Sequence, residues 1–425
     1  MNFKNIDGIN MIRKIQEKLG PGLLYAAAAV GVSHLVSSTT AGATYGMIMV
    51  LYAIVVCLAK YPTFLFGATY AAATGETLVD GYGRLGKWVV VLFFFMQLFE
   101  YTFAISGVSV TTAAIIRGVF NLDMPGIGLE LGLILSCMVI LAIGRYSVLE
   151  DITKVLVIVF TIGTVFATII AVGGIDTGGA ELSANMTLDK PTVLFLVAVA
   201  GWLPTGTAGS VGLSLWVKAK SIRLERPVST KEAAFDFHIG YGTAIFTSVC
   251  FVTLGTLVMY INGVEPAASG ADFSSQLISL FTSTIGNWIY PVIAMAAITV
   301  MYSTLLTLVD LLPRSSTAAL VRIIPKQLEG KFGSIYLVFI GIELFLVLGV
   351  LAALMDQFST FIAWVTSMGF IVAPIFALLN HIVMFGKDIP EADRPGNFIK
   401  MWSYGTITIL SLVTVMFVYL TYLSY

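Results

Sequence analysis

The segment Gly31-Val32-Ser33-His34 is a short polar break inside the first long apolar stretch of the chain. A second break, Trp202-Leu203-Pro204-Thr205-Gly206, interrupts a later apolar stretch. Both stretches otherwise suit the interior of a membrane, where every backbone polar group needs a partner. The N–H and C=O groups freed at such a break must therefore be satisfied by the protein or by a ligand.

The composition indicates a polytopic integral membrane protein in contact with the lipid bilayer. Of 425 residues, 58% are hydrophobic and only 11% are charged, whereas soluble domains are about one quarter charged. Nucleic-acid binding has no support. The three cysteines lie in apolar runs, which suggests neither a disulfide framework nor a thiolate metal site. The three histidines are scattered, and no nucleophile elbow or phosphate loop occurs, so we expect neither an enzyme nor a bound cofactor.

Apolar runs of about 20 residues predict eleven transmembrane helices. We place them at 21–45, 47–71, 88–118, 127–145, 153–173, 192–217, 237–261, 286–311, 334–355, 358–384 and 401–423. No linker is long enough to separate domains, so residues 1–425 are expected to form one transmembrane domain.

Lys and Arg residues predict the orientation, because they are enriched in cytoplasmic loops. With residues 1–19 in the cytoplasm, nearly all basic residues fall inside, and the outside segments hold only Arg117 and Lys190. Lys60 falls within a span. We therefore expect a cytoplasmic N-terminus, an outside C-terminus at Tyr425, and a bacterial inner (plasma) membrane as the location.

The order of the spans predicts two halves of inverted topology. Residues 21–173 would form the first repeat, residues 192–384 the second, and residues 401–423 an extra helix. The first span of each half carries a break, and paired breaks in two such halves point to the binding site of a secondary transporter.

Several motifs resemble the NRAMP family of divalent-metal transporters, which share the leucine-transporter (LeuT) fold. Gly20-Pro21-Gly22-Leu23-Leu24 resembles the family's opening run, and Ala41-Gly42-Ala43-Thr44-Tyr45-Gly46 resembles a stretch further along its first span. Arg145 with Leu149-Glu150 resembles the opening of the family's fifth span, and Pro204 the proline of its sixth. The resemblance implies an all-α, LeuT-like fold: a 5+5 inverted repeat plus one extra helix, with helices 1 and 6 broken.

The chain departs from this family at the metal-binding positions. The family's first break reads Asp-Pro-Gly-Asn, where this chain has Gly31, Val32, Ser33 and His34. The family's sixth span reads Met-Pro-His or a near variant, where this chain has Leu203-Pro204-Thr205. The carboxylate, amide and thioether that hold a transition metal are thus absent. We therefore expect this chain to share the family's fold but not its substrate.

The two breaks supply the predicted substrate site. Its residues are Gly31, Val32, Ser33, His34, Gly201, Trp202, Leu203, Thr205, Gly206 and Thr207. Small residues clear space there, and N–H groups at the half-helix starts can hold an anionic group. Trp202 either walls off an organic ligand or packs between helices. His34 is at most a weak metal ligand; the alternative is a histidine hydrogen-bonded within the bundle.

Charged and hydroxyl side chains inside the spans are the candidates for ion coupling. Lys60 could carry a proton or act as a fixed cation; the alternative is a lysine that snorkels to the membrane surface or forms a structural ion pair. Glu100 is the plainest candidate for its partner or for a proton relay. His34 is a further candidate for proton coupling. Ser303, Thr304 and Thr307 can hold sodium with carbonyls of the first span, or bond back to their own helix. Asp310 and Arg314 are predicted to form a structural pair.

Three functions remain open at this point. The first is a proton- or sodium-coupled transporter, working by alternating access, for a small organic solute such as an amino acid. The second is a divalent-cation transporter with an altered site, carrying an ion such as Mg²⁺ or Mn²⁺. The third is a sensor or channel-like protein without coupled transport. A monomer is expected, with a dimer as the alternative.

Overall fold

The computed structural model describes residues 19–423 except 125, 175–180, 268–275, 277–281, 283–285, 329 and 355–368. The described residues are helical apart from loops and one isolated bridge between Gly46 and Ser183. The helices are α2 (Pro21–Ala29), η1 (Ser33–Ser38), α3 (Thr39–Tyr45), α4 (Ile48–Thr74), α5 (Leu78–Leu85), α6 (Lys87–Phe120), α7 (Gly128–Gly174), α8 (Lys190–Trp202), α9 (Gly209–Arg223), α10 (Thr230–Gly255), η2 (Thr256–Tyr260), η3 (Asn287–Ile289), α12 (Tyr290–Ile323), α13 (Pro325–Leu328), α14 (Phe332–Leu354), α16 (Ala373–Met384), η5 (Glu391–Asp393), α17 (Asn397–Val418) and η6 (Tyr419–Leu423).

The described helices account for the eleven predicted spans. Seven are individually long and apolar enough to cross a membrane, and Pro21–Ala29 with Ser33–Tyr45 forms an eighth, bent by 52°. Helix α7 has 47 residues and is interrupted at Arg145 (φ 48°, ψ −141°), so it supplies two spans. Helices α8 and α9 make the broken sixth span. The tenth, predicted at 358–384, is described only from Gly369 onward.

Some predicted boundaries were wrong. The loop expected at 146–152, between spans four and five, is helical, and Arg145 alone departs from helical geometry. Tyr146, Leu149 and Glu150 are buried there, and Glu150 pairs with Lys154 one turn later at 2.8 Å, so helix continues where a loop was expected. The eighth span continues to Ile323, three turns beyond its predicted end at 311.

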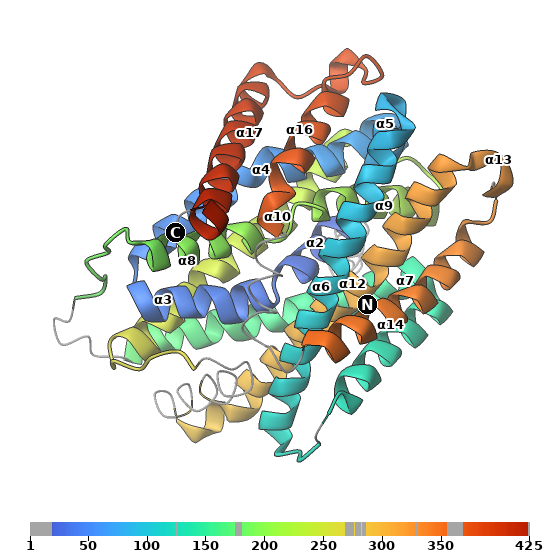
Figure 1. Ribbon diagram of the computed structural model, residues 1–425. Helices are drawn as coiled ribbons and strands as arrows, with labels where there is room; N and C mark the ends of the chain where they lie inside the picture. The colour runs from blue at the N-terminus through green and yellow to red at the C-terminus, as the bar shows by residue number, and fades with distance from the viewer. Residues whose placement is uncertain are drawn as a thin grey trace, which may run out of the picture.

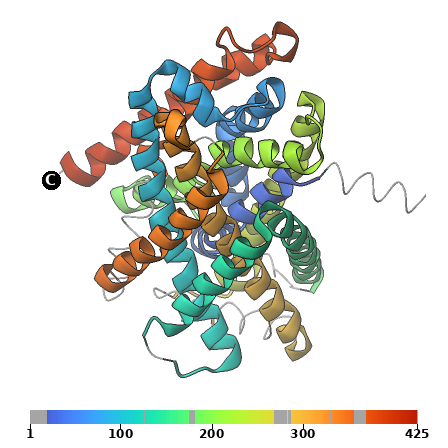
Figure 2. The ribbon, with the colours of Figure 1, turned by 90° about the vertical axis from the view of Figure 1, so that its right-hand side faces the viewer.

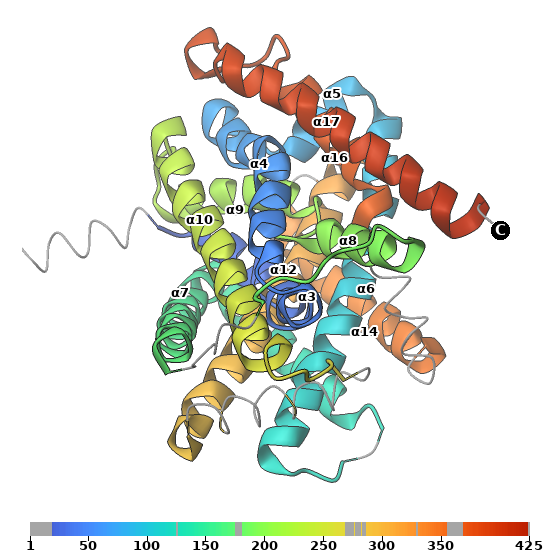
Figure 3. The same ribbon diagram turned by 90° about the vertical axis from the view of Figure 1, so that its left-hand side faces the viewer.

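The broken first span lies at the centre of the molecule (Figure 1). Helix α2 packs against α10, α12, α7 and α9, and α3 continues along α10. Helix α17 lies at the periphery against α16 and α4, and Figures 2 and 3 show its C-terminal end projecting beyond the bundle. This arrangement places the first break inside the protein, away from the surrounding lipid.

Candidate functional site

The first break releases two carbonyl groups from the helical hydrogen-bond pattern. The N–H of Gly31 donates to the carbonyl of Ala29 at 3.0 Å, and the N–H of His34 donates to the carbonyl of Gly31 at 3.1 Å. In a continuous helix these donors would serve the carbonyls of Ala27 and Val30. Both carbonyls lie at the C-terminal end of α2, where the helix dipole is negative.

Thr304 of α12 meets both released carbonyls. Its hydroxyl Oγ1 lies 2.7 Å from the carbonyl oxygen of Ala27, 3.0 Å from that of Val30 and 3.0 Å from that of Val300 in its own helix. A methyl group on Gly31 would lie 2.7 Å from the same hydroxyl, so only glycine admits this contact. One hydroxyl proton thus faces three acceptors, which concentrates oxygen lone pairs at one buried point.

The other two hydroxyls of the predicted sodium set bond back to α12. Ser303 Oγ donates to the carbonyl of Val300 at 2.8 Å, and so shares an acceptor with Thr304. Thr307 Oγ1 donates to the carbonyls of Ser303 and Thr304, at 3.0 and 2.9 Å. Thr304 is therefore the member of the set that reaches across to α2, with Ser303 beside it.

His34 is fully enclosed and bonded through both ring nitrogens. Nε2 lies 2.9 Å from the carbonyl of Ala244 on α10, and Nδ1 lies 2.9 Å from Ser33 Oγ. Since a carbonyl can only accept, Nε2 carries a proton, and it is not free to bind a metal. The geometry matches a histidine that ties η1 to α10. Ser33 Oγ is also within 2.7 Å of the carbonyl of Ala29.

The second break separates α8, which ends at Trp202, from α9, which begins at Gly209. Lys60 of α4 reaches the end of α8, where its ammonium donates to the carbonyl of Gly201 at 2.7 Å. The side chain is only 1% exposed. Its partner is therefore a freed backbone carbonyl, and Glu100, the partner suggested by the sequence, lies outside ion-pair distance.

Glu100 of α6 occupies the other end of this break. Its carboxylate accepts a hydrogen bond from the N–H of Ala208, and a methyl group on Gly206 would lie 2.1 Å from its Oε1. The side chain is 2% exposed, and its Oε2 has no hydrogen-bond partner within the described structure. Lys60 and Glu100 thus face opposite ends of one break, each matching the sign of the helix dipole it meets.

The remaining predicted residues line the second break. Leu203, Thr205 and Thr207 are buried, and the Thr207 hydroxyl has no partner among the described residues. The ring of Trp202 lies against Gly369 of span ten, where an added methyl group would come within 2.9 Å of it. This contact supports interhelical packing for Trp202.

Asp236 is a site residue that the sequence analysis missed. Its carboxylate accepts hydrogen bonds from the N–H groups of Gly20 and Gly22, both at 3.0 Å, and so caps the N-terminus of α2. Lys220 of α9 lies 3.9 Å from the same carboxylate. The prediction began this span at residue 237. The capping box of Ser229 and Glu232 sets the true start at Thr230, and its spacing in the sequence is the signal that could have shown it.

Further ion pairs join the neighbouring helix ends on the same side. Arg223 of α9 pairs with Glu150 and Asp151 of α7 at 2.7 and 2.9 Å. Deeper in the bundle, the predicted pair Asp310–Arg314 is confirmed at 2.6 Å. Trp216 and Tyr336 also donate to Asp310, so this group is satisfied by the protein itself.

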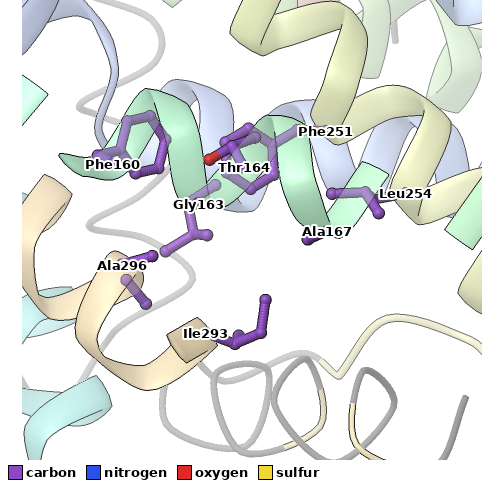
Figure 4. Close-up of a pocket in the computed structure, with 10 residues that line it drawn as sticks. Phe160, Gly163, Thr164, Ala167, Phe251, Leu254, Ile293 and Ala296 are labelled. Atoms are coloured by element: carbon purple, nitrogen blue, oxygen red, sulfur yellow. The ribbon is translucent and has the colours of Figure 1, made fainter. Parts of the chain in front are cut away.

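An apolar cavity borders the first break. It is a partly open hollow between η1, α7, α10 and α12, with a cavity volume of about 20 Å³. Figure 4 shows Phe160 and Phe251 on one side of it and Ile293 and Ala296 on the other. Leu35, which also lines it, directly follows His34. A volume of this size has room for little more than one water molecule, and the lining offers no charge.

The described residues contain no group of three or more His, Cys, Asp or Glu side chains placed to hold a metal ion. The site instead consists of carbonyls, hydroxyls, one ammonium and one carboxylate around two interrupted helices. A helical membrane bundle with two interrupted helices matches the LeuT-like fold class expected from the sequence.

Solved structures with this fold are similar to the chain along nearly its whole length. A manganese transporter of Eremococcus coleocola, in complex with an aromatic bis-isothiourea substituted compound, superposes with a TM-score of 0.73 at 12% identity, covering 96% of this chain and 87% of that one. MhsT in complex with L-phenylalanine gives 0.64 at 15%, covering 95% and 98%. Mhp1, a nucleobase-cation-symport-1 family transporter with bound bromovinylhydantoin, gives 0.57 at 13%, covering 94% and 93%.

The sequence comparison places the chain in a family. No family model matches it. The uncharacterised protein PM0681 of Pasteurella multocida (strain Pm70) is 33% identical over 375 residues, which are 87% of this chain and 85% of that protein. The chain belongs to the same family as this Pasteurella protein, and it is an integral membrane protein of the LeuT-like fold.

Proposed function

We propose that the protein is a secondary active transporter, working by alternating access, that couples uptake of a small organic solute to sodium. One observation carries the proposal. The buried hydroxyl of Thr304 lies within hydrogen-bond distance of two carbonyls released by the first break and of one carbonyl of its own helix. Broken-helix carbonyls are the groups that coordinate coupling ions in transporters of this plan.

Sodium fits this cluster for a simple reason. The Thr304 proton can be donated strongly to one carbonyl at a time, and the other oxygens keep lone pairs directed at the same point. A small hard cation is coordinated by several oxygens at once. Sodium bound there would satisfy the carbonyls of Ala27 and Val30 together and would stabilise the bend of the first span.

The proposed solute site lies between the breaks. The half-helix that follows the first break offers N–H groups at its amino end to an anionic part of a solute, whereas the corresponding end at the second break is taken by Glu100. Lys60, Glu100 and His34 are the remaining candidates for proton coupling. We further propose the orientation that the basic residues predict, with the N-terminus in the cytoplasm, and the repeat boundaries at 21–173 and 192–384.

A divalent-cation transporter is the second candidate, and it is supported by the structural similarity to the Eremococcus manganese transporter. The donor set at the breaks argues against it. A dication normally needs a carboxylate together with further oxygen or nitrogen ligands. Among the described residues the breaks offer one carboxylate, Glu100, which shares its break with the positive charge of Lys60. His34 is already bonded at both nitrogens.

A thermal-stability screen of purified protein tests the proposal. Sodium chloride should stabilise the protein relative to choline chloride, by about 2.7 kcal/mol at a hundredfold excess over the dissociation constant. Manganese and magnesium at millimolar concentration should not. Uptake of amino acids and short organic acids into proteoliposomes should then require a sodium gradient. Stabilisation and uptake that follow manganese and ignore sodium would overturn the proposal in favour of the second candidate.

A further inference from the structure

Lys60 is a buried cation with unused hydrogen-bonding capacity. Its ammonium carries three donors, and within the described chain one of them is used, by the carbonyl of Gly201. No carboxylate of the described residues lies within 4.0 Å of it, whereas the other deeply buried lysine of the described chain, Lys220, has Asp236 at 3.9 Å. Within the part of the chain that the structure describes, Lys60 is therefore a charge that is only partly satisfied.

Such a charge is costly to keep in the interior. Removing an ammonium from water costs several kcal/mol even after relaxation of the surroundings. The negative end of the α8 dipole at Gly201 offsets a part of this cost. An anion in contact with the two unused donors would offset most of the remainder, because charge-assisted hydrogen bonds are the strong ones.

Glu100 attracts Lys60 electrostatically but forms no ion pair with it within 4.0 Å, because its carboxylate serves the opposite end of the break. Its carboxylate accepts from the N–H of Ala208, at the start of α9, and lies against Gly206. The amino end of a half-helix is the usual place for an anionic group of a ligand. In this break the chain's own carboxylate already occupies it, which leaves Lys60 as the group available to a ligand carboxylate.

We infer that Lys60 determines specificity by recognising a carboxylate of the transported solute. The substrates are then small organic acids or amino acids, and simple amines and bare metal cations are rejected by the fixed positive charge. Glu100 adds an acceptor, since its Oε2 has no partner among the described residues and can accept a hydrogen bond from a hydroxyl or amino group of the same solute. This inference rests on the proposed transport function.

The test compares solutes that differ in one charged group. Thermal stability of the wild-type protein is measured in sodium chloride with proteinogenic amino acids, their methyl esters and the corresponding decarboxylated amines, and with short hydroxy acids such as lactate. We expect at least one carboxylate to stabilise the protein, and its ester or amine counterpart to have no effect. The active compound is then titrated against Lys60→Met, Lys60→Arg and the control Lys87→Met, which removes an exposed lysine of α6.

Removing one partner of a buried charge pair costs about 2 kcal/mol or more, so Lys60→Met should raise the half-maximal concentration about thirtyfold or more. Lys60→Arg should retain part of the response and Lys87→Met all of it. Sodium stabilisation at Thr304 should persist in Lys60→Met, which shows that the variant is folded. If Lys60→Met does not fold, the comparison of acids, esters and amines on the wild-type protein still tests whether a carboxylate is recognised.

Two results would overturn the inference. One is an ester or amine that stabilises the wild type as well as its acid; the other is an unchanged titration in a folded Lys60→Met. In both cases sodium stabilisation would leave the proposed function standing. If neither sodium nor any of the solutes stabilises the wild-type protein, the proposed function itself is wrong.

Discussion

The backbone groups released at the two breaks are satisfied by different kinds of side chain. At the first break, carbonyls released from α2 are met by the uncharged hydroxyl of Thr304. At the second, the two half-helix ends are met by full charges, Lys60 at Gly201 and Glu100 at Ala208. A neutral hydroxyl leaves an oxygen-rich point that suits a cation, whereas the charged pair leaves an ammonium that suits an anion. The pseudo-symmetric plan thus separates the proposed ion site from the proposed solute site.

The largest effect should come from Thr304→Val, which keeps the shape of the side chain and removes its hydroxyl. The carbonyls of Ala27 and Val30 lose their cross-helix partner, at a cost of about 1–3 kcal/mol in unfolding free energy. Stabilisation by sodium over choline should disappear. Thermal unfolding in both salts measures it, and a Thr304→Val protein that responds to sodium like the wild type would show that the ion binds elsewhere.

Glycine substitutions compare the two breaks directly. In Gly31→Ala the new methyl group meets Thr304 at 2.6–2.7 Å. Thr304 is a short, β-branched side chain fixed by its hydrogen bonds, so a loss of about 1–3 kcal/mol is expected. In Gly206→Ala the clash is with the end of the Glu100 side chain, which can rotate, and the loss should be smaller.

The control for this pair is Gly341→Ala on α14, where an added methyl group meets nothing within 4 Å. It should leave the unfolding temperature unchanged or slightly raised, because alanine is the better helix former. If Gly206→Ala is the more damaging of the two, the first break is the more adaptable one and the comparison has to be reversed.

His34→Ala tests whether the first break retains any metal site. The substitution removes the bonds of His34 to Ser33 and to the carbonyl of Ala244, which keeps only the Thr247 hydroxyl at 3.1 Å as a side-chain donor. It should cost about 1–3 kcal/mol, with partial recovery in His34→Gln, whose amide can donate. The response of the unfolding temperature to millimolar manganese should be the same as in the wild type. A manganese effect that is present in the wild type and lost in His34→Ala would identify a metal ligand.

The smallest effects should come from the other two hydroxyls. Thr307→Val removes bonds made within α12, so stability should change by less than about 1 kcal/mol and the sodium response should persist. Ser303→Ala should weaken the sodium response modestly, since Ser303 shares the carbonyl of Val300 with Thr304. Titrations of sodium against unfolding temperature rank the three variants; equal losses in all three would contradict a site centred on Thr304.

The sequence predicted the fold better than the site. Apolar runs and the two polar breaks were enough for the spans and the bend in span one, because membrane burial imposes length and composition directly. The LeuT-like fold was implied by the resemblance of the motifs to the NRAMP family. The site depends on directions that composition does not encode. Ser303, Thr304 and Thr307 are equivalent candidates in the sequence, and only the rotation of α12 selects Thr304 to meet α2.

Two departures have local physical reasons. Lys60 pairs with a backbone carbonyl of another helix. A pattern of side chains in the sequence cannot predict which backbone carbonyl will be free to accept such a bond. The helical residues at 146–152 carry enough polar side chains to resemble a loop, but Glu150 is enclosed by Lys154 and Arg223 and the segment remains helical. Asp236 was missed because the capping box of Ser229 and Glu232, which sets the start of α10, was overlooked in the sequence.

Helix α2 is held at both of its ends. Asp236 caps its N-terminus through Gly20 and Gly22, and Thr304 meets its last carbonyls. A helix of nine residues is about 13 Å long and moves as a rigid rod. A change in the bonds at Thr304 is therefore expected to alter the hydrogen bonds that Asp236 makes at the other end of the same helix. The short half-helix thereby connects the first break, at the centre of the protein, to the charged cluster of Asp236 and Lys220.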